Sequence, residues 1–200
     1  MRTRIFALTA SAFTFTLIAC GGSESAGPVS SVSQSTTGVD GGGPLFTRTG
    51  GTFSAVPIDA IGGAAYLLPA PGGTSGVQSR LLIVIGDHPN LCADGPVHSG
   101  GTVFSVDALS GDAKFHAGTF TEMQREAPGQ VDVSVSKLNA SCGSDGKDFG
   151  SATGSVTLTA VTDTGVAGTF DVALLGDAGT LQGTFNVPLC NLPFSSTCQK

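Results

Sequence analysis

The chain has 200 residues, of which 30 are glycine and none is tryptophan. Each glycine weakens a helix interior by up to about 1 kcal/mol relative to alanine, so this composition argues against long helices. Acidic residues number 15 and basic ones 9, and the lysines and arginines are scattered singly along the sequence. Nucleic acid and anionic lipid are bound through clustered lysine and arginine, and we therefore exclude nucleic acid as a class of partner.

Residues 1–19 have the organisation of a secretory signal peptide. Arg2 and Arg4 precede a continuous stretch of apolar or small residues from Ile5 to Ile18. A charged n-region followed by an apolar h-region is typical of such signals. The apolar run is shorter than the about 20 residues that a membrane-spanning helix needs. Removing this peptide takes away two arginines and leaves a formal charge of 7 − 15 = −8.

The signal ends in the run Leu17-Ile18-Ala19-Cys20, which resembles the lipobox of bacterial lipoproteins. In that family the cysteine is diacylated and becomes the first residue of the mature protein. The resemblance implies lipidation (palmitate) of Cys20 and a membrane anchor in the bacterial cell envelope, on the periplasmic or cell-surface side. Gly21 resembles the outer-membrane sorting pattern of enteric lipoproteins, which favours the outer over the inner membrane. The alternative is an ordinary signal peptide with a chance cysteine.

Residues 20–44 are expected to be the acylated cysteine and a flexible linker. From Gly21 to Pro44 the sequence is rich in Gly, Ser, Thr and Val and shows no apolar periodicity. Such a segment behaves as flexible coil, and its length would hold a domain about 25–30 Å from the membrane. Residues 45–200 are then predicted to form a single all-β domain.

The clearest secondary structure lies near the C-terminus. Apolar and polar residues alternate through 151–161, 165–175 and 179–189, and Gly/Asp turns separate these three segments. The alternation predicts a three-stranded antiparallel meander with one buried face.

Weaker strand patterns precede the meander. Leu81–Ile85 is a continuous apolar run that suits a central strand covered on both faces, although its period alone does not distinguish it from a buried helical turn. Segments 102–106 and 115–120 are predicted to pair around the turn Ser110-Gly111-Asp112. Further strands are expected at 53–58, 64–68 and 131–135. About nine short strands predict an antiparallel β-sandwich or a flattened up-and-down barrel.

The tripeptide Gly-Thr-Phe occurs four times, beginning at Gly51, Gly118, Gly168 and Gly183. Its irregular spacing argues against a repeat architecture. We expect each phenylalanine to fill the core while a nearby glycine leaves room for a ring on the next strand. The alternative is that these phenylalanines stack on a ligand.

The cysteine placement resembles a known group of proteins. The stretch from Arg80 through Cys92, the loop at Cys142 and the segment from Val156 to Cys190 are similar to uncharacterised lipoproteins common in myxobacteria. The resemblance covers most of the domain and rests on pattern and cysteine placement. It brings no assigned activity.

Four cysteines besides Cys20 are expected to form disulfides, because the envelope is oxidising. Cys92, Cys142, Cys190 and Cys198 allow three pairings. An up-down-up meander puts Cys142 and Cys190 at opposite ends, about 35 Å apart, which excludes their pairing. Cys198 follows Cys190 by eight residues, and a chain of this length is too short to bring Cys198 back to the end of the meander where Cys142 lies. We therefore predict Cys92–Cys142 and Cys190–Cys198.

One loop carries groups that zinc accepts. Asp87, His88, Cys92 and His98 follow the apolar strand, and three ligands with an open position would suit catalysis. The competing interpretation is a rigid loop whose cysteine is disulfide-bonded, and we expect no metal and no cofactor.

Three other motifs are weaker. His116 stands alone in a strand pattern, and no neighbouring residue in the sequence would form a site with it. Asp145-Gly146-Lys147-Asp148 lacks the ligand ladder of a calcium loop and is read as a solvated turn. Asn139-Ala140-Ser141 matches a glycosylation sequon, which a bacterial lipoprotein gives no reason to use.

No catalytic motif is present. The sequence has no Gly-x-Ser-x-Gly elbow, no His-Glu-x-x-His helix and no phosphate-binding loop. We predict no catalytic residue and expect a non-catalytic binding or structural module on an envelope lipoprotein, with its protein or small-molecule partner unassigned. One alternative is an envelope hydrolase or metal-dependent enzyme using the His88–His98 loop. Another is a carrier of a small apolar ligand, which requires a hollow barrel.

Overall fold

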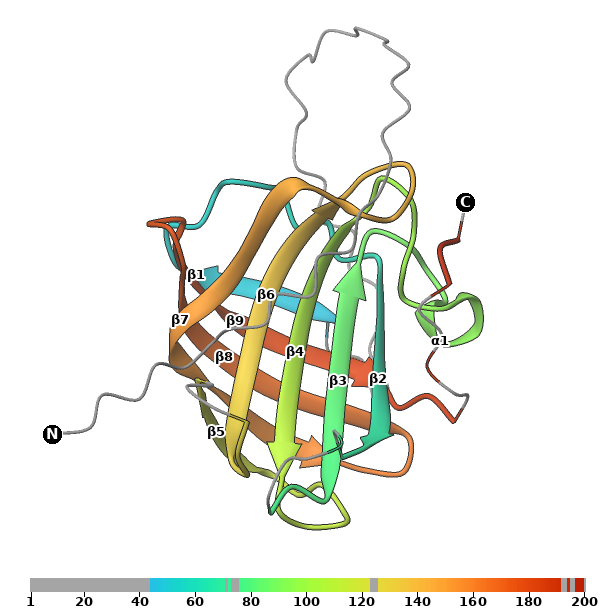
Figure 1. Ribbon diagram of the computed structural model, residues 1–200, viewed down its shortest axis with the longest axis vertical. Coiled ribbons are helices and arrows are strands. Elements are labelled where there is room, and N and C mark those ends of the chain that lie inside the picture. Colours follow the sequence, from blue (N-terminus) through green and yellow to red (C-terminus); the bar gives the residue numbers. More distant parts are fainter. Residues whose placement is uncertain are drawn as a thin grey trace, which may run out of the picture. The chain divides into compact units, whose positions relative to one another are not determined.

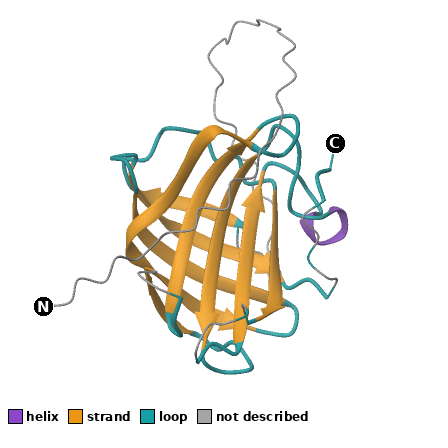
Figure 2. Cartoon of the chain, in the orientation of Figure 1, coloured by secondary structure: helices purple, strands orange, loops and turns teal. Residues whose placement is uncertain are grey.

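A computed structural model describes residues 44–70, 72, 76–122, 126–191, 194 and 197–199. These residues form nine strands and one short helix (Figures 1 and 2). In chain order the elements are β1 (Phe46–Gly50), β2 (Gly62–Pro69), β3 (Ser79–Gly86), α1 (Leu91–Asp94), β4 (Thr102–Ser110), β5 (Gly118–Glu122), β6 (Gln130–Leu138), β7 (Ser144–Val161), β8 (Gly165–Leu174) and β9 (Gly179–Pro188).

The strands belong to one curled sheet with the order β1-β9-β8-β7-β5-β6-β4-β3-β2. Every ladder is antiparallel except a short parallel contact between β5 and β6. Strands β2, β3, β4 and β6 run steeply at the front of Figure 1, and β1, β9 and β8 cross behind them. The predicted all-β, single-domain fold is confirmed, and its strands form one curled sheet, a half-barrel. The strand order is not that of the predicted up-and-down barrel, because β5 lies between β7 and β6.

The sheet curls until β2 meets the end of β9. Ala65 forms a parallel bridge with Leu189, and the Cys190 N–H donates to the Ala65 carbonyl at 2.8 Å. A Cβ atom on Gly63 would lie 2.5 Å from a methyl carbon of Val187. Glycine at this position therefore allows the two strands to approach closely.

Side chains fill the interior of the curled sheet. The rings of Phe46, Phe104 and Phe170 contact one another, with centroids 4.9–5.5 Å apart. The phenylalanines of all four Gly-Thr-Phe tripeptides are buried, as predicted. These rings occupy the space that a carrier of an apolar ligand would have to leave open.

A second apolar cluster lies on the outer face of β2 and β3. It contains Ala64, Tyr66, Val84 and Leu91. The Tyr66 hydroxyl donates to the Leu91 carbonyl at 2.7 Å, and burial raises the pKa of this phenol. Phe194 packs edge-on against the Tyr66 ring, with centroids 5.3 Å apart. The cluster joins α1 and the C-terminal segment to the sheet.

Strand β3 is buried on its inner face and largely covered on its outer face, where Val84 is buried and Leu82 half-buried, in line with its continuous apolar run. Leu81, Ile83 and Ile85 face the interior core, whereas Val84 belongs to the outer cluster. The meander is also confirmed as β7, β8 and β9, although β7 begins at Ser144 and is longer than expected.

The strand predicted at 53–58 is wrong, because the first strand is β1 and residues 51–61 contain no strand. Pro57 has no N–H to give to a ladder. Phe53 and Val56 are nevertheless buried, and the Phe53 N–H donates to the Thr180 carbonyl at 2.9 Å. Apolar residues here fill the core from an irregular segment.

The predicted pairing of segments 102–106 and 115–120 is also wrong. Strand β4 pairs with β3 and β6, and β5 pairs with β7 and, briefly, with β6. The turn at 110–112 therefore leads into a connection of seven residues and not into a hairpin.

The predicted disulfide pairing is wrong. Cys92 is bonded to Cys190 and Cys142 to Cys198, with Cα–Cα distances of 5.3 and 5.6 Å. All four cysteines are paired, and Cys142 does not pair with Cys190, as the meander predicts.

Closure of the sheet explains the observed pairs. The bridge between β2 and Leu189 brings Cys190 to α1, which carries Cys92. The chain then reaches the loop after α1, where Gln199 pairs with His98. That loop lies beside the β6–β7 hairpin, because the Gly100 N–H donates to the Asn139 carbonyl at 2.9 Å.

Candidate functional site

The sheet forks between β6 and β7, and β5 enters the fork. The two strands pair from Ser134↔Gly150 to their shared hairpin. On the other side of the fork, β5 pairs with β7 as far as Thr121↔Ser155. Residues 152–154 of β7 therefore lie between the two ladders. A bulge before Thr153 and a φ of +131° at Gly154 bend β7 at this point.

A polar chain of hydrogen bonds holds the fork together. The Ser151 hydroxyl donates to the Glu122 carboxylate and accepts the Val133 N–H at 3.0 Å. Ser151 is buried, so the side chain replaces a ladder partner that β6 lacks here. On the neighbouring strand ends, the Gln130 amide donates to the Thr121 hydroxyl at 3.3 Å.

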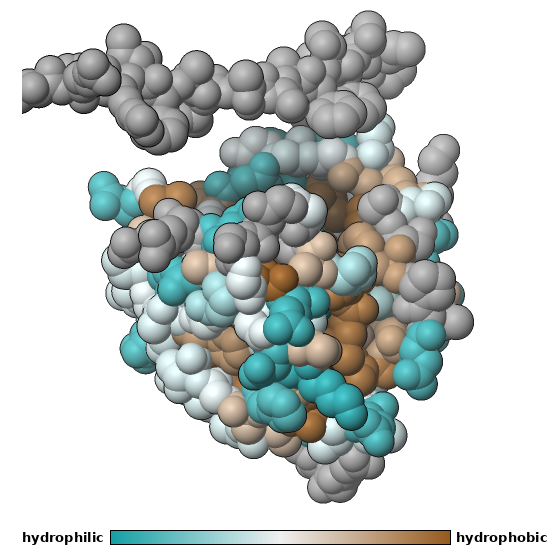
Figure 3. Space-filling model, turned by 60° about the horizontal axis from the view of Figure 1, so that its bottom comes forward, coloured by the Kyte–Doolittle hydropathy of each residue, from teal (hydrophilic) through white to brown (hydrophobic). Residues whose placement is uncertain are grey.

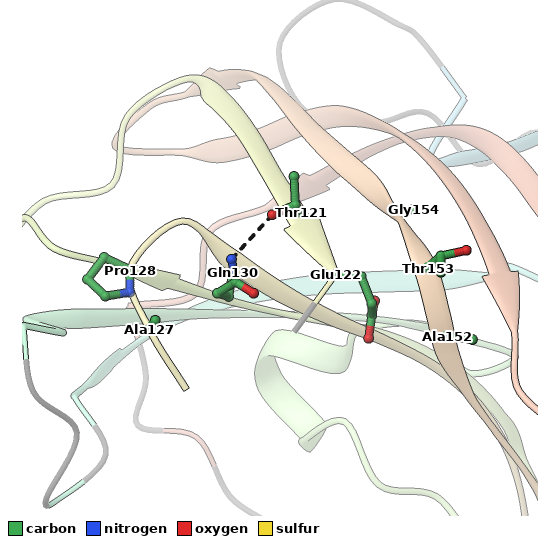
Figure 4. A pocket seen from close by; sticks show the side chains of 8 residues that line it. All are labelled: Thr121, Glu122, Ala127, Pro128, Gln130, Ala152, Thr153 and Gly154. Atoms are coloured by element: carbon green, nitrogen blue, oxygen red, sulfur yellow. Dashed lines mark hydrogen bonds between the residues drawn. The ribbon is translucent and has the colours of Figure 1, made fainter. Parts of the chain in front are cut away.

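A cavity of about 730 Å³ opens at this fork (Figure 4). Its polar lining consists of Thr121, Glu122, Gln130 and Thr153, and its other described lining residues are Ala, Pro and Gly. In Figure 4 the Glu122 side chain extends between the ribbons of β6 and β7. We call this cavity the fork cleft.

The fork cleft was not predicted from the sequence. One signal was available, because Phe120 faces the core and Glu122 follows it by two residues on the same strand. Strand alternation therefore predicts a carboxylate on the buried face, which requires a hydrogen-bond partner.

The loop after β3 brings His88 and His98 together. Their rings stack with centroids 4.1 Å apart. Asp87 does not complete a site, because its carboxylate oxygen lies 3.7 Å from the His88 Nε2 and its other oxygen accepts the Thr102 N–H at 3.1 Å. Cys92 is in a disulfide and so offers no thiolate.

The loop leaves little space for a ligand. The His98 Nε2 lies 2.9 Å from the Gly95 carbonyl oxygen, to which it donates. The space beside the two rings is about 10 Å³, close to the minimum for one water molecule. In the part of the chain that the structure describes, no group of three His, Cys, Asp or Glu residues could hold a metal ion.

The weaker motifs occupy exposed positions. His116, Asp145 and Asp148 are exposed. The Asn139 side-chain oxygen accepts the Ser141 and Gly143 N–H groups at 2.8 and 3.1 Å, and its nitrogen donates to the Ser144 carbonyl. This asparagine therefore shapes the β6–β7 hairpin.

Charged groups also gather on the neighbouring strands β3, β4 and β6. Arg80 donates to both oxygens of Asp107, at 2.7 and 2.5 Å. Asp132 is the register partner of Asp107 on β6, and burial together with the Asp107 charge raises its pKa. The arginine engages one of these two carboxylates in a bidentate pair, which is the strong geometry for this contact.

Exposed large apolar side chains are few in the described ranges. They are Ile61, Leu67 and Leu175, which lie before β2, on β2 and after β8. On the face shown in Figure 3, apolar residues form a band among hydrophilic ones. No helix in the described part of the chain is long and apolar enough to cross a membrane.

The predicted signal peptide, Cys20 and the linker up to residue 43 lie outside the described residues. Comparison with known protein families, with curated proteins and with solved structures finds no match to this chain.

Proposed function

We propose that this protein is a lipid-anchored lipoprotein of the bacterial cell envelope, and that its β domain is a non-catalytic binding or structural module. The run Leu17-Ile18-Ala19-Cys20 carries the proposal, because a small residue before the cysteine and a leucine three before it match the lipobox. The lipid on Cys20 anchors the protein in the membrane, which is its proposed partner. Gly21 favours the outer membrane.

The cysteines of the domain support an envelope location. Cys92–Cys190 and Cys142–Cys198 are disulfides, and such bonds persist in oxidising compartments such as the periplasm and the cell surface. The alternative enzyme would use the His88–His98 loop. The stacked rings, the oxidised Cys92 and the distance between His88 and Asp87 do not favour it.

The test is a comparison of Cys20→Ser with Ser23→Ala in the producing bacterium. A diacylated cysteine buries two acyl chains, each CH₂ contributing about 0.8 kcal/mol, so the parent should stay with the membrane fraction. We expect Cys20→Ser to lose incorporation of a labelled fatty acid and to leave the membrane or remain unprocessed. Ser23→Ala should behave as the parent. Normal lipid labelling of Cys20→Ser would contradict the proposal.

A further inference from the structure

We propose that the loop between β3 and β4, together with the end of the chain, forms a redox-sensitive cover on the outside of the sheet. The cover opens when a dithiol reduces the Cys92–Cys190 and Cys142–Cys198 bonds, and it then exposes Tyr66 while the sheet stays folded. The inference goes beyond the proposed function, because it concerns a change of conformation within the domain. We call this cover the outer cover, and its described parts are residues 87–101, Phe194, Cys198 and Gln199.

The outer cover packs on an apolar cluster that is separate from the interior core. Leu91 of α1 belongs to this outer cluster together with Tyr66 and Val84 on β2 and β3. Cys92 and Cys190 pack against the same cluster. Figure 1 shows α1 and the C-terminal end beside β2, outside the curled sheet. The interior core consists of other residues, so opening of the cover uncovers the outer cluster and leaves the interior packing in place.

The outer cover has little regular structure of its own. Helix α1 has four residues, and a helix of about one turn is not stable alone. Two hydrogen bonds join the loop to the chain end. The Ser99 N–H donates to the Gln199 carbonyl, and the Gln199 N–H donates to the Val97 carbonyl, both at 2.9 Å. Each contributes less than a disulfide, and a segment with few such contacts opens at a lower free energy than the core strands.

The two disulfides fasten the outer cover at different points. Cys92–Cys190 joins α1 to the residue that follows the end of β9 by two positions. Cys142–Cys198 joins the end of the chain to the β6–β7 hairpin. All four cysteines are half-buried, and they are therefore partly open to solvent and to a reductant.

Reduction of each bond is a thiol–disulfide exchange. A thiolate of the dithiol attacks one sulfur of the pair, which breaks the protein S–S bond and forms a mixed disulfide. The second thiol of the reductant then attacks the mixed disulfide and releases the protein cysteine. The products are two cysteine thiols and a cyclic disulfide, so two electrons and two protons pass from the reductant to the protein. After both exchanges, hydrogen bonds and apolar contacts alone hold the cover.

The first experiment is hydrogen exchange of the purified full chain in detergent, with and without dithiothreitol. Residues 87–101 report on the cover, and β8 reports on the sheet, where it lies between β7 and β9. After reduction we expect residues 87–101 to exchange at least about tenfold faster, whereas β8 should stay protected by about a hundredfold or more relative to an unfolded chain. Unchanged exchange in residues 87–101 would overturn the proposal. Loss of protection in β8 would also overturn it, because the disulfides would then hold the whole domain.

Tyr66 gives an independent measurement of the opening. The chain has one tyrosine and no tryptophan, so its tyrosine fluorescence comes from Tyr66 alone. This residue is 2 % exposed in the folded protein. We expect reduction to raise the iodide quenching constant of this fluorescence by about twofold or more. A quenching constant that does not rise would mean that the outer cluster stays covered, and the proposal would be wrong.

A matched pair of variants tests whether the chain end covers Tyr66. Phe194 packs edge-on against the Tyr66 ring with centroids 5.3 Å apart, and Phe149 makes a similar contact of 5.4 Å with Phe53. Both phenylalanines are half-buried. Without reductant, Phe194→Ala should raise the iodide quenching constant of Tyr66, and Phe149→Ala should leave it unchanged. Equal quenching in the two variants would show that the chain end does not shield Tyr66 and would overturn the proposal.

Discussion

Phe185 on β9 covers Gly168, its register partner on β8. A Cβ atom on Gly168 would lie 2.6 Å from the Cζ of this ring. The reverse pair lies two residues along the strands, where a Cβ on Gly183 would lie 2.5 Å from the Cζ of Phe170. Each glycine thus provides the space that a phenylalanine of the neighbouring strand occupies, and two of the four Gly-Thr-Phe tripeptides interlock.

Gly168→Ala tests this relationship. The new methyl would also meet the Thr157 carbonyl oxygen at 2.5 Å, so movement of the Phe185 ring alone cannot accommodate it. We expect a loss of about 1–3 kcal/mol in the free energy of unfolding, measured with urea. Gly118→Ala is the control, because a Cβ there meets no atom within 4 Å. It should change stability by less than about 0.5 kcal/mol, and equal losses in the two variants would contradict the steric argument.

The features that the sequence predicted correctly are local ones. Alternation and Gly/Asp turns define β7, β8 and β9, since both signals depend on residues that are neighbours in the chain. In each tripeptide the glycine and the phenylalanine are two residues apart. On the adjacent antiparallel strands β8 and β9, this equal spacing places each glycine opposite the phenylalanine of the other tripeptide, at Gly168↔Phe185 and Phe170↔Gly183.

Closure of the sheet was not predictable in this way. The contact between Ala65 and Leu189 joins residues far apart in sequence, and no local pattern specifies it. The disulfides depend on that contact, because it brings Cys190 to α1. The predicted pairing was wrong because the contact was not foreseen. The position of β5 has the same origin, because its partner Ser155 lies beyond an intervening strand. The fork cleft exists only through this insertion, and Glu122 on a core-facing position was its one local sign.

The disulfide pairing itself can be checked directly. Peptide mapping of the non-reduced protein should link Cys92 to Cys190 and Cys142 to Cys198. Replacing either pair with serine should cost about 2–5 kcal/mol. The Cys92–Cys190 bond spans 98 residues against 56 for the other, so its removal should cost about 0.5 kcal/mol more by loop entropy. A Cys92–Cys142 peptide would contradict the observed closure.

Ser151→Ala tests the hydrogen bonds in the fork. The change removes the acceptor of the Val133 N–H and the donor to Glu122 in a buried position. An unsatisfied buried polar group costs about 1–3 kcal/mol, and we expect a loss of that size in urea unfolding. Ser155→Ala, on the same strand at a half-buried position, should change stability by less than about 0.5 kcal/mol. A loss no larger than that of the control would show that the fork does not depend on this side chain.

The carboxylates of Asp107 and Asp132 face each other across β4 and β6, and Arg80 pairs with Asp107. Burial, and then the negative charge of Asp107, raise the pKa of Asp132 above its ordinary value of 3.8. The folded chain therefore holds a proton at pH values where the unfolded chain has released it. Stability must fall as pH rises through this interval, and the cost is fully present above the raised pKa.

Asp132→Asn removes that cost because the amide does not ionise. At pH 7 we expect the variant to be more stable than the parent, by less than about 1 kcal/mol, because the side chain is only half-buried and solvent screens the repulsion. The advantage should shrink toward zero as pH falls below 3.8, where both the folded and the unfolded parent are protonated. Urea unfolding at pH 7 and near pH 3.5 measures the difference. Asp163→Asn, at an exposed turn position, is the control and should show no comparable dependence on pH. An Asp132→Asn variant that is less stable than the parent at pH 7 would mean that the ionised carboxylate makes a favourable contact that outweighs its burial and its repulsion by Asp107.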